Sequence, residues 1–94
     1  MKIKLSSYGR YSGNYGTNSL KITIDSLTLY FSYETIVAFQ DGGNDLKVIH
    51  NQWGATTGKH LNFIDGGCKS NRLSEKEFTE ELEKTLRAHN LEMQ

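Results

Sequence analysis

The segment from Gly54 to His60, Gly-Ala-Thr-Thr-Gly-Lys-His, has the residue types of a phosphate-binding loop. Glycine-rich loops can point several backbone N–H groups at an anion. A nucleotide-binding P-loop, however, has four residues between its glycines and is followed by a helix. Only three residues separate Gly54 from Gly58, and the pattern after them favours a strand, so the segment does not fit a P-loop. Two alternatives stay open, an ordered hairpin turn and a looser anion site at Thr56, Thr57 and Lys59.

Four residues with metal-binding or nucleophilic chemistry follow within a short stretch: His50, His60, Asp65 and Cys68. Structural zinc sites usually have paired ligands such as Cys-x-x-Cys, and this stretch has none. Cys68, His60 and Asp65 are the residue types of a cysteine triad, but a catalytic thiolate needs a positioned base, and Cys68 follows two glycines in a predicted connection. We therefore expect no metal, no cofactor and no catalytic residues, and we expect that the protein is not an enzyme.

Aromatic and basic residues in two segments favour binding instead of catalysis. Ser6–Ser19 is rich in Ser, Gly, Asn and Tyr, as adaptable recognition loops are, and Trp53 precedes the Thr-rich segment. Tyr, Trp and Arg are enriched at protein–protein hot spots, and aromatic rings can also stack on nucleic-acid bases. The predicted partner-binding residues are Tyr8, Arg10, Tyr11, Tyr15, Trp53, Thr56, Thr57, Lys59 and His60.

The composition fits one small folded domain. The chain has 94 residues, and its 11 basic and 11 acidic side chains give a formal net charge of zero. This balance argues against general nucleic-acid binding, which needs a clustered excess of Lys and Arg. A single cysteine excludes an internal disulfide, and no apolar run approaches the roughly 20 residues that span a bilayer. We therefore expect a cytoplasmic protein.

Alternation of apolar and polar residues predicts the strands that would position these residues. The predicted strands are a short one at Ile3 and Leu5, then Leu20–Ile24, Leu27–Phe31, Thr35–Gln40, Leu46–Trp53 and His60–Ile64. A tight hairpin is expected at Asp25-Ser26. Ser74 and Glu77 then form a capping box, and Phe78, Leu82 and Leu86 recur every four residues, which predicts a helix over about 74–89.

These elements predict a single α+β domain over residues 1–94. An antiparallel meander of five or six strands within residues 2–64 would carry one C-terminal α-helix on one face, because a helix of this length is marginal unless it docks on the sheet. The second face or a free strand edge could meet a partner, and a homodimer stays open.

Three segments, Phe31–Phe39, Thr56–Gly67 and Arg72–Phe78, resemble a family of short, uncharacterised proteins of bacteriophages and prophages. The sequence Thr-Thr-Gly-Lys-His-Leu-Asn, which begins at Thr56, is the most specific shared motif. The resemblance implies a phage or mobile-element origin and no particular activity. Small phage proteins without catalytic motifs often act on host machinery by binding to it.

We therefore expect a non-catalytic protein of the host-cell cytoplasm that binds a host protein or protein–nucleic-acid complex. The leading hypothesis is an inhibitor of a host defence system, of the anti-CRISPR kind. The alternatives are a nucleic-acid-binding accessory protein that uses the Tyr/Trp/Arg/Lys loop surface, and a small enzyme with an anion site in the Thr56–His60 segment.

Overall fold

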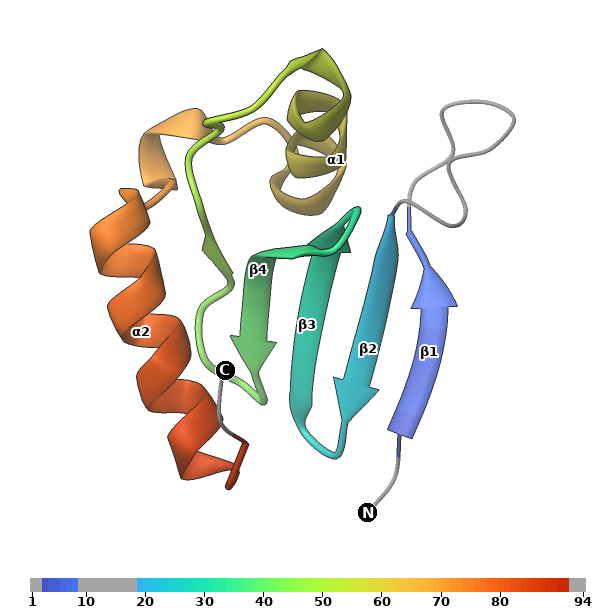
Figure 1. Ribbon diagram of the computed structural model, residues 1–94, viewed down its shortest axis with the longest axis vertical. Helices are drawn as coiled ribbons and strands as arrows, with labels where there is room; N and C mark the ends of the chain where they lie inside the picture. Colours follow the sequence, from blue (N-terminus) through green and yellow to red (C-terminus); the bar gives the residue numbers. More distant parts are fainter. Residues whose placement is uncertain (1–2, 9–18, 92–94) are drawn as a thin grey trace.

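The computed structural model describes residues 3–8 and 19–91. In this part of the chain, a five-stranded antiparallel meander is followed by two α-helices, which confirms the α+β class (Figure 1). The sheet order is β1-β2-β3-β4-β5, so strands that are neighbours in the sequence are neighbours in the sheet. The elements are β1 (Ile3–Ser7), β2 (Leu20–Ile24), β3 (Leu27–Ser32), β4 (Thr35–Asp41), β5 (Lys47–Val48), α1 (Ala55–Asp65), the short 3₁₀ helix η2 (Lys69–Asn71) and α2 (Glu75–Ala88).

Two-residue turns connect the central strands and fix their register. Ile24 pairs with Leu27 across the Asp25-Ser26 turn, as the sequence predicts, and Ser32 pairs with Thr35 across the next turn. Each turn begins with a residue in the left-handed region, Asp25 at φ 53° and Tyr33 at φ 58°. Asp tolerates this conformation, whereas it is unusual for a bulky residue such as Tyr33.

The core lies between the sheet and α2. Leu29 and Phe39 are directly opposite each other on β3 and β4, and the Phe39 ring meets the ring of Phe78 edge-to-face at 5.5 Å. Phe78, Leu82 and Leu86 are all buried, which confirms the predicted apolar stripe of this helix. Burying each such side chain contributes roughly 1.5–3 kcal/mol, so docking on the sheet stabilises a helix that would be marginal alone.

The first strand lies at the edge of the sheet farthest from α2 (Figure 1). Its Leu5 pairs with Ile22, which pairs in turn with Leu29, so these three side chains share one face. Ile3 and Leu5 are nevertheless each 62% exposed, because the helices do not reach this edge. The homodimer that a free edge would allow remains a prediction.

The N-terminus of α2 has the predicted capping box. The Ser74 hydroxyl accepts a hydrogen bond from the Glu77 backbone N–H at 3.3 Å and donates one to the Glu77 carboxylate at 3.0 Å. We expect Ser74→Ala to lower the free energy of unfolding by about 1 kcal/mol, because the first turn loses its cap. Urea denaturation checks this, with Ser70→Ala in η2 as the matched control. An equal effect in both variants would contradict a capping role.

Two sequence predictions about the segment between β4 and α2 are wrong. Residues His60–Ile64 are not a strand but the second half of α1, so the chain has a further helix before α2. The buried residues of α1, Thr57, His60 and Leu61, have helical spacing. Because two of them are polar, the sequence shows no apolar pattern with the period of a helix. The strand predicted over Leu46–Trp53 is also too long. Only Lys47–Val48 belongs to the ladder, and Ile49 then bridges to Leu73 in parallel.

Candidate functional site

Helix α1 is positioned by a turn at Asn51. The Asn51 side-chain oxygen accepts a hydrogen bond from the Trp53 backbone N–H at 2.9 Å, and its amide nitrogen donates to the Gly54 carbonyl at 3.3 Å. This Asx-type turn replaces the hairpin expected at this place and leads directly into the N-cap at Gly54. It holds Trp53 just before the first turn of α1, with 44% of the residue exposed.

A buried polar cluster of Ser32, Thr57 and His60 joins α1 to the end of β3. The Ser32 hydroxyl lies 3.0 Å from the Thr57 hydroxyl and 2.8 Å from Nδ1 of His60. Ser32 is 3% exposed and His60 is fully buried. Burial lowers the pKa of His60 below its usual value, because the charged imidazolium loses its hydration. His60 is therefore a neutral hydrogen-bonding residue near neutral pH.

The Ser32–His60 contact pairs a hydroxyl with an imidazole, as a catalytic nucleophile is paired with its base. Ser32 also lines a pocket with Tyr33, Thr35, Val37, Trp53 and Thr57. The pocket has a volume of about 160 Å³, which is small compared with the roughly 300–1,000 Å³ of most small-molecule sites. The Ser32 hydroxyl already contacts both Thr57 and His60. The cluster therefore holds α1 against the sheet through hydrogen bonds between buried side chains.

Three exposed aromatic residues lie near this cluster, and we call them the aromatic surface: Tyr33, Trp53 and Phe63. Their exposed fractions are 50%, 44% and 55%. Tyr33 and Trp53 line the same pocket, and the Tyr33 ring lies 6.0 Å from the ring of His60. On the other side, Tyr8 lies 6.0 Å from His60 and 6.2 Å from Phe63. Tyr33 and Trp53 are therefore neighbours at the α1 end of the sheet, and Phe63 is linked to them through the buried rings of Tyr8 and His60.

The same end of the sheet holds both ends of the Tyr-rich segment. The Tyr8 backbone N–H donates to the Ser19 carbonyl at 2.8 Å, and the Ser19 hydroxyl donates to the Tyr8 carbonyl at 2.7 Å. The Tyr8 hydroxyl donates to the carbonyl of Phe31 at 2.6 Å. Tyr8 and Ser19, the described residues at the two sides of the Tyr-rich segment, therefore lie at the same end of the sheet as α1. Three of the predicted residues, Arg10, Tyr11 and Tyr15, lie outside the described residues.

The remaining predicted binding residues divide between surface and interior. Tyr8, Thr57 and His60 are buried, so the prediction that they contact a partner directly needs correction. Lys59 is exposed and Thr56 is half-buried. The looser anion site at Thr56, Thr57 and Lys59 does not form as expected, because the segment is helical and Thr57 faces Ser32.

Tyr33 and Phe63 are not among the binding residues predicted from the sequence. Tyr33 lies between two predicted strands, and Phe63 lies in a segment predicted as a strand, where it would share a face with Leu61. The available signal for Tyr33 was a large aromatic residue in a two-residue turn. Phe63 could be recognised only once α1 was known to be a helix, because it lies off the buried face of Thr57, His60 and Leu61.

The residues considered for metal binding and for a triad do not form one cluster in the described part of the chain, although the Cys68 backbone N–H lies 3.4 Å from the Asp65 carbonyl. His60 contacts Ser32, whereas Asp65 pairs with Arg72, and Cys68 is exposed. Within residues 3–8 and 19–91, no three His, Cys, Asp or Glu side chains gather where they could hold a metal ion. None of the helices in this part of the chain is long and apolar enough to cross a membrane.

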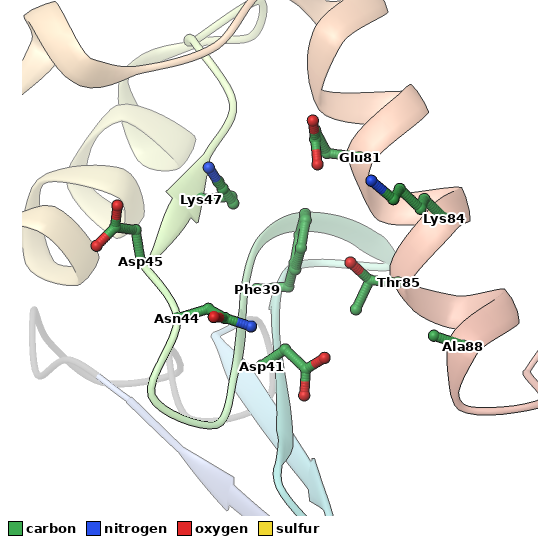
Figure 2. Close-up of a pocket in the computed structure, with 9 residues that line it drawn as sticks. All are labelled: Phe39, Asp41, Asn44, Asp45, Lys47, Glu81, Lys84, Thr85 and Ala88. Carbon is green, nitrogen blue, oxygen red and sulfur yellow. The ribbon is translucent and has the colours of Figure 1, made fainter.

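A pocket of about 390 Å³ lies between the β4–β5 region and α2 (Figure 2). Its charged residues are of both signs, so no single charge dominates it. Next to it, His89 Nε2 lies 2.9 Å from the Asp41 carboxylate, which ties the end of α2 to β4. The pocket therefore has no clear preference for a charged ligand. Its lining is Phe39, Asp41, Asn44, Asp45, Lys47, Glu81, Lys84, Thr85 and Ala88.

Residues 3–80 match a family of unknown function (DUF8033). The chain belongs to this family. The match covers the whole sheet, α1, and the aromatic surface, so these features lie in the family's domain. The family description gives neither an activity nor a source, and the phage origin inferred from the sequence is therefore not shown by it. Comparisons with curated proteins and with solved structures give no match.

Proposed function

We propose that the protein acts without catalysis, by binding a protein partner through the aromatic surface. The observation that supports this proposal is the exposure of Tyr33, Trp53 and Phe63 around one end of a small domain. Single exposed apolar residues are ordinary, but Tyr33 and Trp53 line one pocket together, and adjacent exposed apolar side chains are typical of binding sites. Tyr and Trp are also the residues that most often dominate binding energy at interfaces.

The aromatic surface is rigidly supported, which favours binding. The Trp53 backbone is held by the Asn51 turn, and hydrogen bonds of Ser32 join α1 to the sheet through His60. Residues that are already held in position lose less conformational freedom on binding, so more of the contact energy contributes to affinity. Tyr33 has a positive φ of 58°, a conformation that costs a non-glycine residue of order 1–3 kcal/mol and that often occurs at functional sites.

The partner that we propose is a host protein, alone or within a protein–nucleic-acid complex, and the role is inhibition of a host defence system. This more specific part rests on the resemblance of Phe31–Phe39, Thr56–Gly67 and Arg72–Phe78 to phage and prophage proteins. A zero net charge also favours a protein partner over bare nucleic acid, which attracts basic surfaces.

We expect Trp53→Ala to weaken partner binding at least about 30-fold, the effect of losing a hot-spot residue of about 2 kcal/mol or more. Tyr33→Asn is expected to weaken binding as well, yet to fold at least as stably, because Asn tolerates positive φ better than Tyr. The measurement is affinity capture from a bacterial lysate, followed by mass spectrometry and by titration of the captured partner.

The control variant is Ile3→Ala, which removes an exposed apolar side chain at the opposite end of β1 from Tyr8. It should retain the partner. Capture is repeated after nuclease treatment, because loss of the partner on nuclease treatment would point to nucleic acid as the bound molecule. Equal capture by wild type, Trp53→Ala and Tyr33→Asn would refute binding through the aromatic surface.

A further inference from the structure

A pocket of about 260 Å³ lies between α1 and the segment that follows it. Gly58 and Asn62 contribute from one stripe of α1, since they are four residues apart. The segment before the helix contributes His50 and Asn51, and the segment after it contributes Lys69 and Arg72. The pocket thus brings together three separate parts of the chain, and among the described residues its lining contains neither a carboxylate nor a large apolar side chain.

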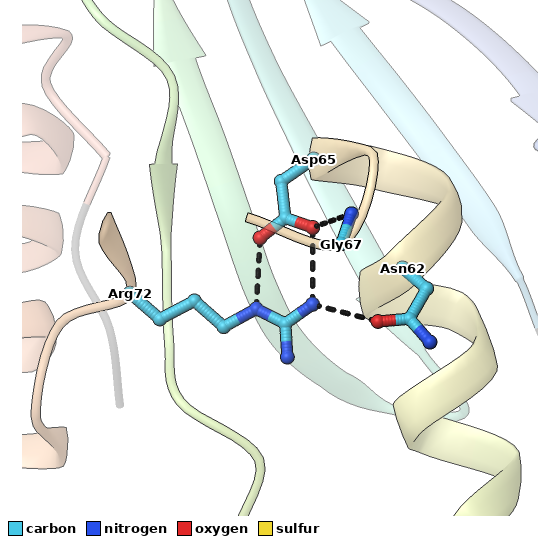
Figure 3. Close-up of polar contacts among 4 residues, drawn as sticks. All are labelled: Asn62, Asp65, Gly67 and Arg72. Carbon is cyan, nitrogen blue, oxygen red and sulfur yellow. Dashed lines mark hydrogen bonds and ion pairs between the residues drawn. The ribbon is translucent and has the colours of Figure 1, made fainter. Parts of the chain in front are cut away.

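Arg72 is the fixed element of this pocket. Its Nε and Nη2 atoms donate to the two carboxylate oxygens of Asp65 at 2.8 and 3.0 Å, and Nη2 also donates to Asn62 Oδ1 at 3.0 Å (Figure 3). The Arg72 side chain is only 4% exposed. The remaining nitrogen, Nη1, makes no hydrogen bond to any residue in the described ranges, and Figure 3 shows it on the side of the guanidinium away from Asp65. A preset N–H donor is therefore available.

Asn62 supplies a second oriented donor. Because its Oδ1 accepts from Arg72, its side-chain nitrogen must be turned away from the guanidinium, as Figure 3 shows. This nitrogen can only donate. The contact with Arg72 therefore determines the orientation of the Asn62 amide. In this orientation, the amide nitrogen of Asn62 places its N–H groups beside the pocket.

The charge of the lining is positive. Asp65 offsets the charge of Arg72 from the other side of the guanidinium, but Lys69 and His50 are exposed and form no ion pair with the described residues. Gly58 keeps α1 close to Asn51, because a Cβ at this position would lie 3.2 Å from the Asn51 amide nitrogen. Cationic and amide side chains thus line a space that is open in the described part of the structure.

We propose that this pocket binds a phosphate group, either as free phosphate or as the terminal phosphate of a small molecule. Arginine and lysine together with amide N–H groups are the donors that phosphate oxygens prefer. Arg72 Nη1, Lys69 Nζ and the Asn62 amide nitrogen would hold the oxygens, and His50 would close the open side. This binding site differs from the aromatic surface and does not depend on the proposed protein partner.

The test is an NMR titration of the full chain with inorganic phosphate, with sodium chloride at equal ionic strength as the comparison. We expect saturable shifts at Gly58, Asn62 and Lys69 with phosphate and not with chloride. Titration with a nucleoside monophosphate separates the two sources: tighter binding than inorganic phosphate indicates a nucleotide, and equal binding indicates the free ion. Linear, unsaturated shifts at phosphate concentrations on the order of 10 mM, or the same shifts with chloride, would overturn the proposal.

Two variants test the chemistry without disturbing the fold. Asn62→Asp retains an oxygen for Arg72 but replaces the donor with a negative charge, so it should abolish phosphate binding in a stable protein. Lys69→Gln should weaken binding about tenfold, the effect of losing one charge-assisted contact. Lys84→Gln, on α2 and outside this pocket, should change nothing. Unchanged phosphate binding in Asn62→Asp would rule out this pocket as the site.

Discussion

Replacing Arg72 with methionine is expected to lower the free energy of unfolding by about 3–5 kcal/mol. The Arg72 and Asp65 side chains are only 4% and 9% exposed, so the variant leaves a carboxylate inside the protein without its counter-charge. Typical domains are stable by about 5–15 kcal/mol, and this single change therefore removes a large fraction of the total. Urea denaturation at neutral pH measures it. Asp65→Asn should be destabilising as well, because it leaves the Arg72 charge unpaired and turns an amide N–H toward one of the Arg72 donors.

The loss of stability in Arg72→Met should come from breaking the Arg72–Asp65 pair and not from losing the arginine alone. A variant with both Arg72→Met and Asp65→Leu should be closer in stability to the wild type than Arg72→Met, because no charge is then left buried. The hydrogen bond from Arg72 is the main cause that lowers the pKa of Asp65 below its ordinary value of 3.8. The stabilisation that the ionised Asp65 gives the folded protein is therefore present above pH 3.8. It is lost as the pH falls through the pKa of Asp65 in the folded state. Equal losses in the single and double variants would contradict this account.

The sheet and α2 were predictable because their apolar residues follow a regular period in the sequence. Apolar residues occupy every second position in Leu20–Ile24 and in Leu27–Phe31, and the Asp25-Ser26 turn between them follows from their spacing. The buried residues of α2 recur every four positions after a capping box. In both cases one face of a regular element is apolar, and such a pattern is visible in a single sequence.

Helix α1 was not predictable in the same way, because the contacts that hold it are polar and distant in the sequence. Thr57 and His60 are buried against Ser32, which lies 25 and 28 positions away. A glycine inside the helix and a pair of threonines also lower its intrinsic propensity. Tertiary hydrogen bonds override these local preferences. The sequence of α1 has no periodic apolar pattern from which these hydrogen bonds could be predicted.

The candidate site was predicted only in part for the same reason. Residue type alone predicts Trp53 as a binding residue, and the structure shows that it is exposed. The Arg72–Asp65 pair depends on the two positive-φ glycines, Gly66 and Gly67, which turn the chain back after α1. Without the helix, the sequence offered no reason to place Arg72 beside Asn62. The phosphate-binding pocket that we propose therefore emerges only from the three-dimensional arrangement.

Replacing His60 with alanine is expected to lower the free energy of unfolding by about 2–4 kcal/mol. The ring is fully buried, lies between Tyr8 and Tyr33, and bonds to the Ser32 hydroxyl. The variant leaves a cavity and takes a partner from a buried hydroxyl. His50→Ala is the matched control, because His50 is exposed and its loss should change stability little.

The same residue should make stability depend on pH. Burial lowers the pKa of folded His60 below 6.5, so between the two pKa values the unfolded state binds more protons than the folded state. Stability is then complete above pH 6.5 and falls as the pH drops toward the folded-state pKa, by at most about 1.4 kcal/mol for each pH unit. Urea denaturation at pH 7.5 and at pH 5.5 should show this loss in the wild type and in His50→Ala, but a smaller one in His60→Ala. His60→Ala could instead lose as much stability on acidification as the wild type. Another group would then be responsible, and His60 would not be the buried, uncharged residue that holds α1 against the sheet.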